Sequence, residues 1–196
     1  MATSIPIAKE DMTKALLIID VQNAILAGKG TPQRQPLIDM ALNETVARLR
    51  RLKELARQQS APVVIVQHDG EADHRLAIGT NGWEIRHELA PAEDDVVVHK
   101  KSPDSFFGTD LEDRLKEKSV THLVVGGCMT QFCVDTTVRR AVSLGYDVTL
   151  VADGHTTADS QTLTFADIVA HHNETLHDFD AGSATIIVRP VADIQF

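Results

Sequence analysis

Apolar residues along this chain form short continuous runs, and these runs alternate with segments in which apolar residues recur every three or four positions. The runs predict strands at Ala15–Val21, Pro62–His68, Asp95–His99, His122–Gly126, Asp147–Ala152 and Ala184–Val188. The recurring positions predict helices at Pro36–Gln59, Asp110–Lys118, Cys133–Leu144 and Gln161–Leu176. This alternation indicates an α/β fold, a Rossmann-like three-layer αβα sandwich around a mainly parallel six-stranded sheet.

The length of 196 residues suits one domain, and no linker or internal repeat divides the chain. We therefore expect residues 1–196 to form a single domain with a core at about residues 14–188. No run of about 18 apolar residues is present, so a membrane span is not expected. Met1–Asp11 contains no basic segment followed by an apolar one, so export is not expected either.

Net charge bears on whether the chain binds nucleic acid, and cysteine content bears on its cellular compartment. The chain has 19 basic and 28 acidic residues and a formal net charge of −9. Nucleic-acid binding requires a basic surface, so a nucleic-acid partner is not expected. Two cysteines do not make a disulfide framework, which agrees with a reducing compartment, and we expect a cytoplasmic protein.

Three reactive side chains fall at the predicted carboxyl ends of strands, where parallel sheets bind their ligands. Asp20 ends the first strand, Lys100 ends the third, and Cys133 follows the fourth. The first turn of a helix offers unpaired N–H groups that lower the pKa of a thiol, so Cys133 is a candidate nucleophile. Each residue also has a structural alternative: a turn aspartate, a solvated pair of Lys100 with Lys101, and a small buried cysteine.

Three motifs contain these residues: Leu17–Gln22 around Asp20, Lys100–Leu111 with its Phe-Phe-Gly-Thr-Asp-Leu ending, and Gly126–Thr137 around Cys133. In their order and spacing they resemble the isochorismatase-like cysteine hydrolases, a superfamily that includes nicotinamidases and N-carbamoylsarcosine amidohydrolase. The resemblance extends over nearly the whole chain, from about Lys14 to Val188.

The resemblance implies a chemistry for these residues. Cys133 attacks the carbonyl carbon of an amide or ureido C–N bond, Asp20 transfers the thiol proton to the leaving nitrogen, and Lys100 supports the ionised pair. Water then hydrolyses the acyl-thioester enzyme. The family's cis peptide corresponds to Cys128–Met129, and the N–H groups of Met129 and Cys133 form an oxyanion hole that stabilises charge in the transition state.

The histidines raise the question of a metal. Nicotinamidases of this superfamily carry an Asp-x-His…His site after the second strand, whereas this chain reads Gln67-His-Asp-Gly-Glu-Ala-Asp-His74. His68 and His74 depart from that pattern, so we expect no metal and no other cofactor. His155, His171 and His172 are expected to cap, pack or lie at an interface. Cys128 lacks Cys-x-x-Cys spacing and is interpreted as structural, with a redox pair as the alternative.

The substrate pocket is expected to involve Gln22, Trp83 and Phe106. Gly70–Leu89 lacks clear periodicity and is predicted to be a long functional loop that carries the only tryptophan. Trp83 stacks on a planar substrate or anchors the core or an interface. The Gly-Trp-Glu-Ile segment and Ala170–Leu176 resemble a metal-free bacterial branch that includes streptothricin hydrolase, which implies a small-molecule amide, cyclic amide or carbamoyl substrate.

Two alternatives to a cysteine amidohydrolase remain. One is an enol-ether hydrolase of the isochorismate type, which in known members does without the cysteine. The other is a non-catalytic binding protein on the same scaffold. Because family members commonly associate, a homodimer or larger homo-oligomer is expected.

Overall fold

The structure, a computed structural model, describes residues 13–196; the expectation about export from Met1–Asp11 lies outside the described residues. The described residues contain seven strands: β1 (Lys14–Ile19), β2 (Val63–His68), β3 (Val96–Lys100), β4 (His122–Cys128), β5 (Asp147–Thr156), β6 (Asp180–Ala181) and β7 (Ala184–Arg189). The helices are α1 (Gln35–Gln58), α2 (Leu111–Glu117), α3 (Asp135–Ser143) and α4 (Phe165–Leu176). Three short helical turns join them: η1 (His87–Leu89), η2 (Thr130–Val134) and η3 (Val191–Asp193).

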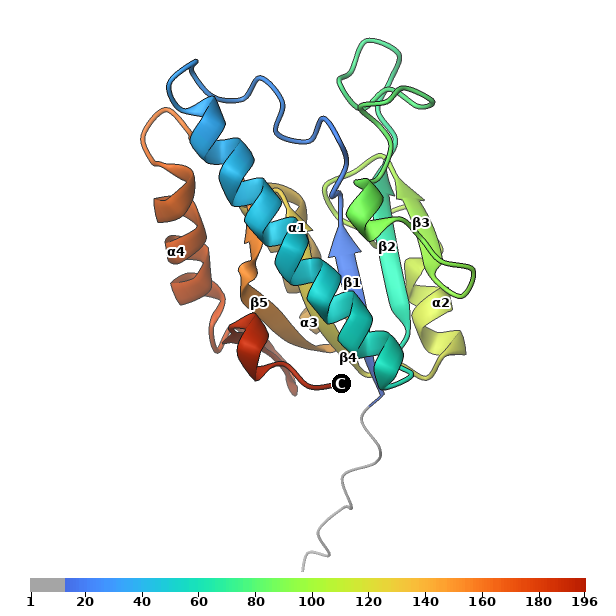
Figure 1. Ribbon diagram of the computed structural model, residues 1–196. Coiled ribbons are helices and arrows are strands. Elements are labelled where there is room, and N and C mark those ends of the chain that lie inside the picture. Colours follow the sequence, from blue (N-terminus) through green and yellow to red (C-terminus); the bar gives the residue numbers. More distant parts are fainter. Residues whose placement is uncertain (1–12) are drawn as a thin grey trace, which may run out of the picture.

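The strands form one sheet in the order β3-β2-β1-β4-β5-β7-β6 (Figure 1). All neighbours are parallel except β6 and β7, so the predicted α/β fold with a mainly parallel sheet is confirmed. The predicted number of six strands is wrong. The seventh strand, β6, has two residues and pairs antiparallel with β7, and so short an element leaves no periodic pattern.

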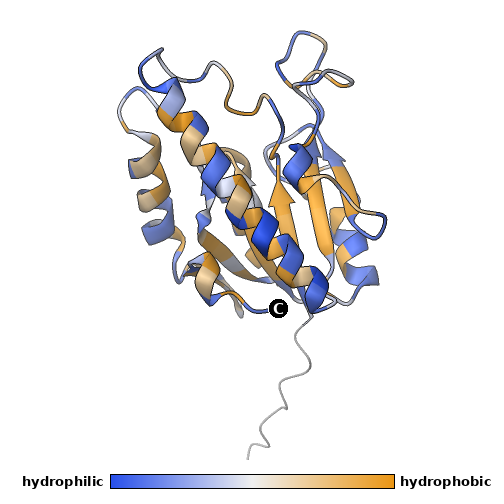
Figure 2. Ribbon diagram, viewed as in Figure 1, coloured by the Kyte–Doolittle hydropathy of each residue, from blue (hydrophilic) through white to orange (hydrophobic). Residues whose placement is uncertain are grey.

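Helices on both sides bury the apolar faces of the sheet. The buried stripe of α1, which includes Ile38, Leu49 and Leu52, packs in one core cluster with Leu16 and Ile18 of β1. The opposite cluster combines side chains of α2 and α3 with alternate residues of the same strands. The polar faces of the outer helices and the apolar strands between them are visible in Figure 2. Because side chains alternate between the two faces along each strand, the one sheet contributes to a core cluster on each side.

Two predicted helix boundaries are wrong for local reasons. The helix expected at Cys133–Leu144 is divided, because the π-helical turn η2 contains Cys133 and α3 begins only at Asp135. The helix expected from Gln161 begins at Phe165, where Thr164 and Asp167 form a reciprocal capping box. Capping at Thr164 therefore determines where α4 begins.

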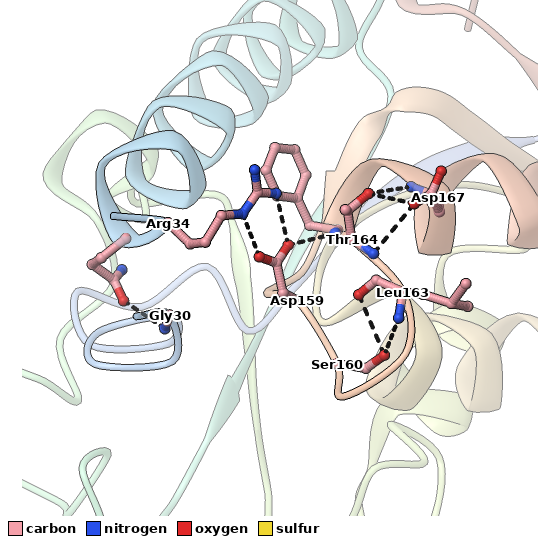
Figure 3. A network of polar contacts seen from close by, with 9 residues as sticks. Gly30, Arg34, Asp159, Ser160, Leu163, Thr164 and Asp167 are labelled. Carbon is pink, nitrogen blue, oxygen red and sulfur yellow. Dashed lines mark hydrogen bonds and ion pairs between the residues drawn. The ribbon is translucent and has the colours of Figure 1, made fainter. Parts of the chain in front are cut away.

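The loops at the carboxyl edge of the sheet are connected by polar contacts. Arg34, just before α1, contacts Asp159 through two nitrogens at 2.6 and 3.1 Å (Figure 3). Asp159 also accepts a hydrogen bond from the N–H of Phe165 at 2.8 Å, and the Arg34 guanidinium lies 5.6 Å from the Phe165 ring centre. These contacts join the segment after β1 to the segment after β5. Within residues 13–196, no helix combines the length and apolar character needed to cross a membrane.

Candidate active site

Asp20 and Lys100 meet at the carboxyl edge of the sheet. Asp20 directly follows β1 in a left-handed conformation (φ 51°), and its N–H donates to the carbonyl of Val66 in β2. Lys100 is the last residue of β3, on the other side of β2. Its Nζ lies 2.7 Å from Oδ2 of Asp20 and donates to the carbonyl of Ser102 at 2.8 Å. Both charged side chains are shielded from solvent, with exposures of 1% and 0%.

Burial and the nearby cation act in opposite directions on the pKa of Asp20. Burial raises the pKa of Asp20 above its ordinary value, while the charge of Lys100 and a contact with Cys133 oppose that rise. Apart from the ion pair, neither carboxylate oxygen has a directed hydrogen bond from the described residues. Asp20 therefore forms an ion pair with Lys100 and lies in contact with Cys133.

Cys133 lies beside this pair in the turn η2, immediately after β4. Its side chain is partly buried and packs against the core cluster that contains Val66, Val98 and Val134. The expectation that the helix start lowers the pKa of this thiol is wrong. Burial and the negative charge of Asp20 raise the pKa of Cys133 to about 12, and Lys100 opposes the rise. The resting group is therefore a neutral thiol.

The strand leading to this turn carries the other cysteine. The peptide bond between Cys128 and Met129 is cis. Cys128 has no exposed surface and packs in the cluster beneath α1, on the opposite side of the sheet from the cluster that Cys133 contacts. Burial raises the pKa of the Cys128 thiol far above its ordinary value. Its environment is that of an apolar core residue.

A cavity of about 410 Å³ opens next to Lys100. It is lined by Asp69, His99, Lys100, Lys101, Ser102, Phe107 and Gly108. Trp83 stands behind this lining: its indole N–H donates to Oδ1 of Asp69 at 2.8 Å, and its ring stacks on His99 with centroids 5.9 Å apart. Asp69 and His99 therefore form one wall of the cavity, and Trp83 contacts both of them without lining it.

Phe106 and Phe107 occupy different environments. Phe106 is 9% exposed and packs in the core, with its ring 6.0 Å from that of Tyr146. Phe107 is 71% exposed and lines the cavity. The sequence pointed to Phe106, whereas Phe107 lines this cavity, because the loop has no periodicity that shows which of two adjacent aromatic residues points outward.

Gln22 is fully buried, and backbone partners occupy its side-chain amide. Its Nε2 donates to the carbonyls of His68 and Trp83 at 3.0 and 2.7 Å, and its Oε1 accepts from the N–H of His68 at 3.0 Å. These bonds hold the end of β2 and the loop containing Trp83 against the segment after β1. The structure therefore gives Gln22 an anchoring position between β1, β2 and the loop that carries Trp83.

The two histidines considered as metal ligands lie close together, with ring centroids of His68 and His74 5.7 Å apart. Within residues 13–196, no group of three or more His, Cys, Asp or Glu side chains has an arrangement suited to a metal ion. His68 is the last residue of β2 and pairs in register with Lys100, so it belongs to the same edge as the ion pair.

His155 lies on a second cavity, of about 310 Å³, between α1 and α4. Its ring nitrogens contact the hydroxyl of Thr130 and the side-chain oxygen of Asn173, each at 2.9 Å. His155 is 2% exposed, and burial lowers its pKa to about 4. It therefore connects η2 to α4 as a buried neutral group.

The chain is similar in sequence to known proteins of one family. Residues 14–177 match the isochorismatase domain family. A streptothricin hydrolase from Streptomyces noursei is 38% identical over 146 residues, which cover 74% of this chain and 55% of that protein. The ureidoacrylate amidohydrolase RutB from Variovorax paradoxus is 26% identical over 177 residues, covering 76% of this chain and 70% of that protein.

Among solved structures, an isochorismatase from Pseudomonas putida superposes with a TM-score of 0.82 at 30% identity, covering 93% of this chain and 90% of that chain. The family match extends over most of the chain and includes the segments that carry Asp20, Lys100 and Cys133. This chain therefore belongs to the isochorismatase-like hydrolase family.

Proposed function

We propose that this protein is a cysteine hydrolase that cleaves a C–N bond of a small molecule through an acyl-thioester enzyme. The observation that carries the proposal is the buried contact of Asp20 with Lys100, 2.7 Å apart, beside the partly buried thiol of Cys133. A base, a cation and a nucleophile are thus gathered at one sheet edge. Two relatives, named as a streptothricin hydrolase and a ureidoacrylate amidohydrolase, support hydrolysis of this kind.

The first half of the reaction forms the acyl enzyme. The Cys133 sulfur bonds to the carbonyl carbon while its proton moves to Asp20. The resulting oxyanion receives hydrogen bonds from the N–H groups of Met129 and Cys133. As the tetrahedral species collapses, the C–N bond breaks and Asp20 returns the proton to the leaving nitrogen, which departs as an amine or ammonia.

Lys100 stabilises the two negatively charged groups that take part in this proton transfer. Its positive charge stabilises the Asp20 carboxylate before the transfer and the developing thiolate during it, and it lowers the pKa of both groups. Trp83 contributes indirectly, by holding Asp69 and His99 in the wall of the cavity. This wall favours a planar polar group of the substrate. We assign Gln22 to anchoring the site and Phe107, in place of Phe106, to contact with the substrate.

Two other functions are weaker. An enol-ether hydrolase of the isochorismate type does not require a cysteine nucleophile, whereas Cys133 stands beside a proton acceptor here. A binding protein without turnover has no need for a buried Asp20–Lys100 pair, which is costly to desolvate and, for binding alone, is replaceable by apolar packing.

The test is a panel of small linear amides, cyclic amides and carbamoyl compounds, assayed for release of ammonia or amine. We expect release from at least one class, and loss of that release in Cys133→Ala. Turnover that persists in Cys133→Ala, or confinement of activity to enol ethers, would contradict the proposal.

We also propose that the protein forms a homodimer or a larger homo-oligomer. Light scattering that gives the 21.4 kDa mass of one chain would contradict this part of the proposal.

A further inference from the structure

His68 lies at this site, but the chemistry of Asp20, Lys100 and Cys133 leaves it without a role. It ends β2, the strand between those that carry Asp20 and Lys100. Val64 and Val66 of β2 belong to the core cluster against which Cys133 packs. Because side chains alternate along a strand, His68 faces the same side as these two valines.

The same argument applies to the neighbouring strand. Val98 of β3 belongs to that cluster, so Lys100, two residues later, also faces this side. His68 and Lys100 are direct partners in the β2–β3 register. The imidazole of His68 therefore stands next to the ion pair, on the face of the sheet where Cys133 lies.

The backbone that carries His68 is held firmly. Its N–H donates to Oε1 of Gln22 and its carbonyl accepts from Nε2 of Gln22, both at 3.0 Å. Gln22 is fully buried, and its Nε2 also donates to the carbonyl of Trp83. These contacts fix the backbone from which the His68 side chain projects toward Asp20 and Lys100.

The ring itself has an unused polar atom. Nδ1 of His68 is buried and has no hydrogen-bond partner among the described residues, and the same holds for both oxygens of Asp20 outside the ion pair. Buried polar groups are normally satisfied by protein or by an ordered water molecule. Burial lowers the pKa of His68, so the ring is neutral near pH 7, with one donor and one acceptor nitrogen.

We propose that His68 is a positioning residue that holds the water molecule for the second half of the reaction, hydrolysis of the acyl-thioester. This inference rests on the proposed function. The ring orients the water by a hydrogen bond at Nδ1. The water oxygen bonds to the thioester carbonyl carbon, and one water proton moves to the Asp20 carboxylate. The C–S bond then breaks, and Asp20 returns that proton to the sulfur of Cys133, so His68 undergoes no net change.

His74 provides a matched control. Its ring centroid lies 5.7 Å from that of His68, but its Nδ1 already accepts a hydrogen bond from the N–H of Leu76 at 3.2 Å. Replacing His74 tests for general disturbance of the loop, whereas replacing His68 removes the unused nitrogen. Two variants of His68 separate position from volume: His68→Leu removes both nitrogens, and His68→Asn keeps a polar atom near the place of Nδ1.

The experiment uses p-nitrophenyl acetate as the probe. Release of p-nitrophenolate in a single turnover reports acetylation of Cys133, and intact-protein mass spectrometry of the isolated acetyl enzyme reports its hydrolysis. We expect His68→Leu to slow deacetylation by about tenfold, as for loss of one directing hydrogen bond, with acetylation changed by less than about threefold. His68→Asn recovers part of the loss, and His74→Gln behaves like the wild type. Circular dichroism confirms that each variant is folded.

The outcomes separate the two proposals. If the wild type forms no acetyl enzyme that depends on Cys133, the proposed function is wrong and this inference is wrong with it. If the acetyl enzyme forms but both folded His68 variants hydrolyse it at the wild-type rate, only the role of His68 is wrong. Equal slowing of acetylation and deacetylation also contradicts a role specific to the water step.

Discussion

The ammonium group of Lys100 lies 2.7 Å from the carboxylate of Asp20, and solvent reaches neither side chain appreciably. These residues come from strands on opposite sides of β2 and are 80 positions apart in the sequence (100 − 20). Charges buried in this way are expensive to desolvate, and removing one partner leaves the other uncompensated. The neighbouring Lys101 is 67% exposed and pairs at 3.3 Å with the exposed Glu71.

This contrast predicts different effects of two adjacent substitutions. Lys100→Ala removes the charge that opposes protonation of the buried Asp20 and that lowers the pKa of the Cys133 thiol, so Asp20 is less available as a proton acceptor and the thiolate is less stable. We expect kcat/KM to fall at least about a hundredfold, which corresponds to about 2.7 kcal/mol of transition-state stabilisation. Lys101→Ala changes kcat/KM by less than about fivefold, because Lys101, at the exposed rim of the cavity, pairs with Glu71 and not with Asp20. Steady-state kinetics of folded variants decide the ranking, and the reverse order refutes the assignment.

The two cysteines differ in reactivity. Cys133→Ala and Cys133→Ser are expected to lower turnover by several orders of magnitude without unfolding the chain, whereas Cys128→Ala retains most of it. In the native protein, iodoacetamide is expected to label the partly buried Cys133 before the fully buried Cys128. Peptide mapping after labelling identifies the site, and preferential labelling of Cys128 contradicts the assignment.

The labelling rate also carries a pH dependence. With the pKa of Cys133 at about 12, only a small fraction of the group is thiolate at neutral pH. Because thiolate is the reacting form, the labelling rate rises about tenfold per pH unit through the neutral and mildly alkaline range. A rate that levels off near neutral pH indicates a preformed thiolate and contradicts the neutral resting state.

Gln22 is predicted to stabilise the site through its backbone contacts. Gln22→Ala removes the side chain that makes three hydrogen bonds to the backbone of His68 and Trp83 in a fully buried position. We expect the free energy of unfolding to fall by about 2–4 kcal/mol, since buried groups lose their partners. Asn23→Ala, which removes one exposed bond to the Asn81 carbonyl, is the control and costs less than about 1 kcal/mol. Urea denaturation measures both, and equal losses contradict this role of Gln22.

His155 is predicted to make the fold sensitive to acid. Its pKa is lowered from 6.5 to about 4 in the folded chain, mainly by burial. Between these values the unfolded chain binds a proton that the folded chain does not, so stability falls as pH decreases from 6.5 to about 4. Over the whole range from pH 6.5 to about 4, His155 lowers the free energy of unfolding by about 3 kcal/mol. Denaturation curves across this range are expected to show a weaker pH dependence for His155→Asn than for the wild type, and identical dependence contradicts the prediction.

The strands of the central sheet were predictable because each is a buried apolar run, and burial on both faces leaves a clear mark on the sequence. The end of β5 was not. It was predicted to end at Ala152 but continues to Thr156 through Asp153 and Gly154, and the register shift between Val125 and Gly127 of β4 accommodates it. The polar residues in that extension form their hydrogen bonds only in the folded chain, so no local sequence pattern predicts that they belong to the strand.

The sequence by itself determined the α/β fold and the residues at the carboxyl ends of β1 and β3, because hydrophobic periodicity is a local property and alternating strands and helices form a parallel sheet. Only the tertiary structure brought Asp20 within 2.7 Å of Lys100 and placed Phe107, rather than Phe106, on the cavity. It also reversed the expected change in the pKa of Cys133, since burial and the charge of Asp20 raise it. Desolvation and the field of neighbouring charges depend on residues distant in the chain, so only the folded arrangement sets them.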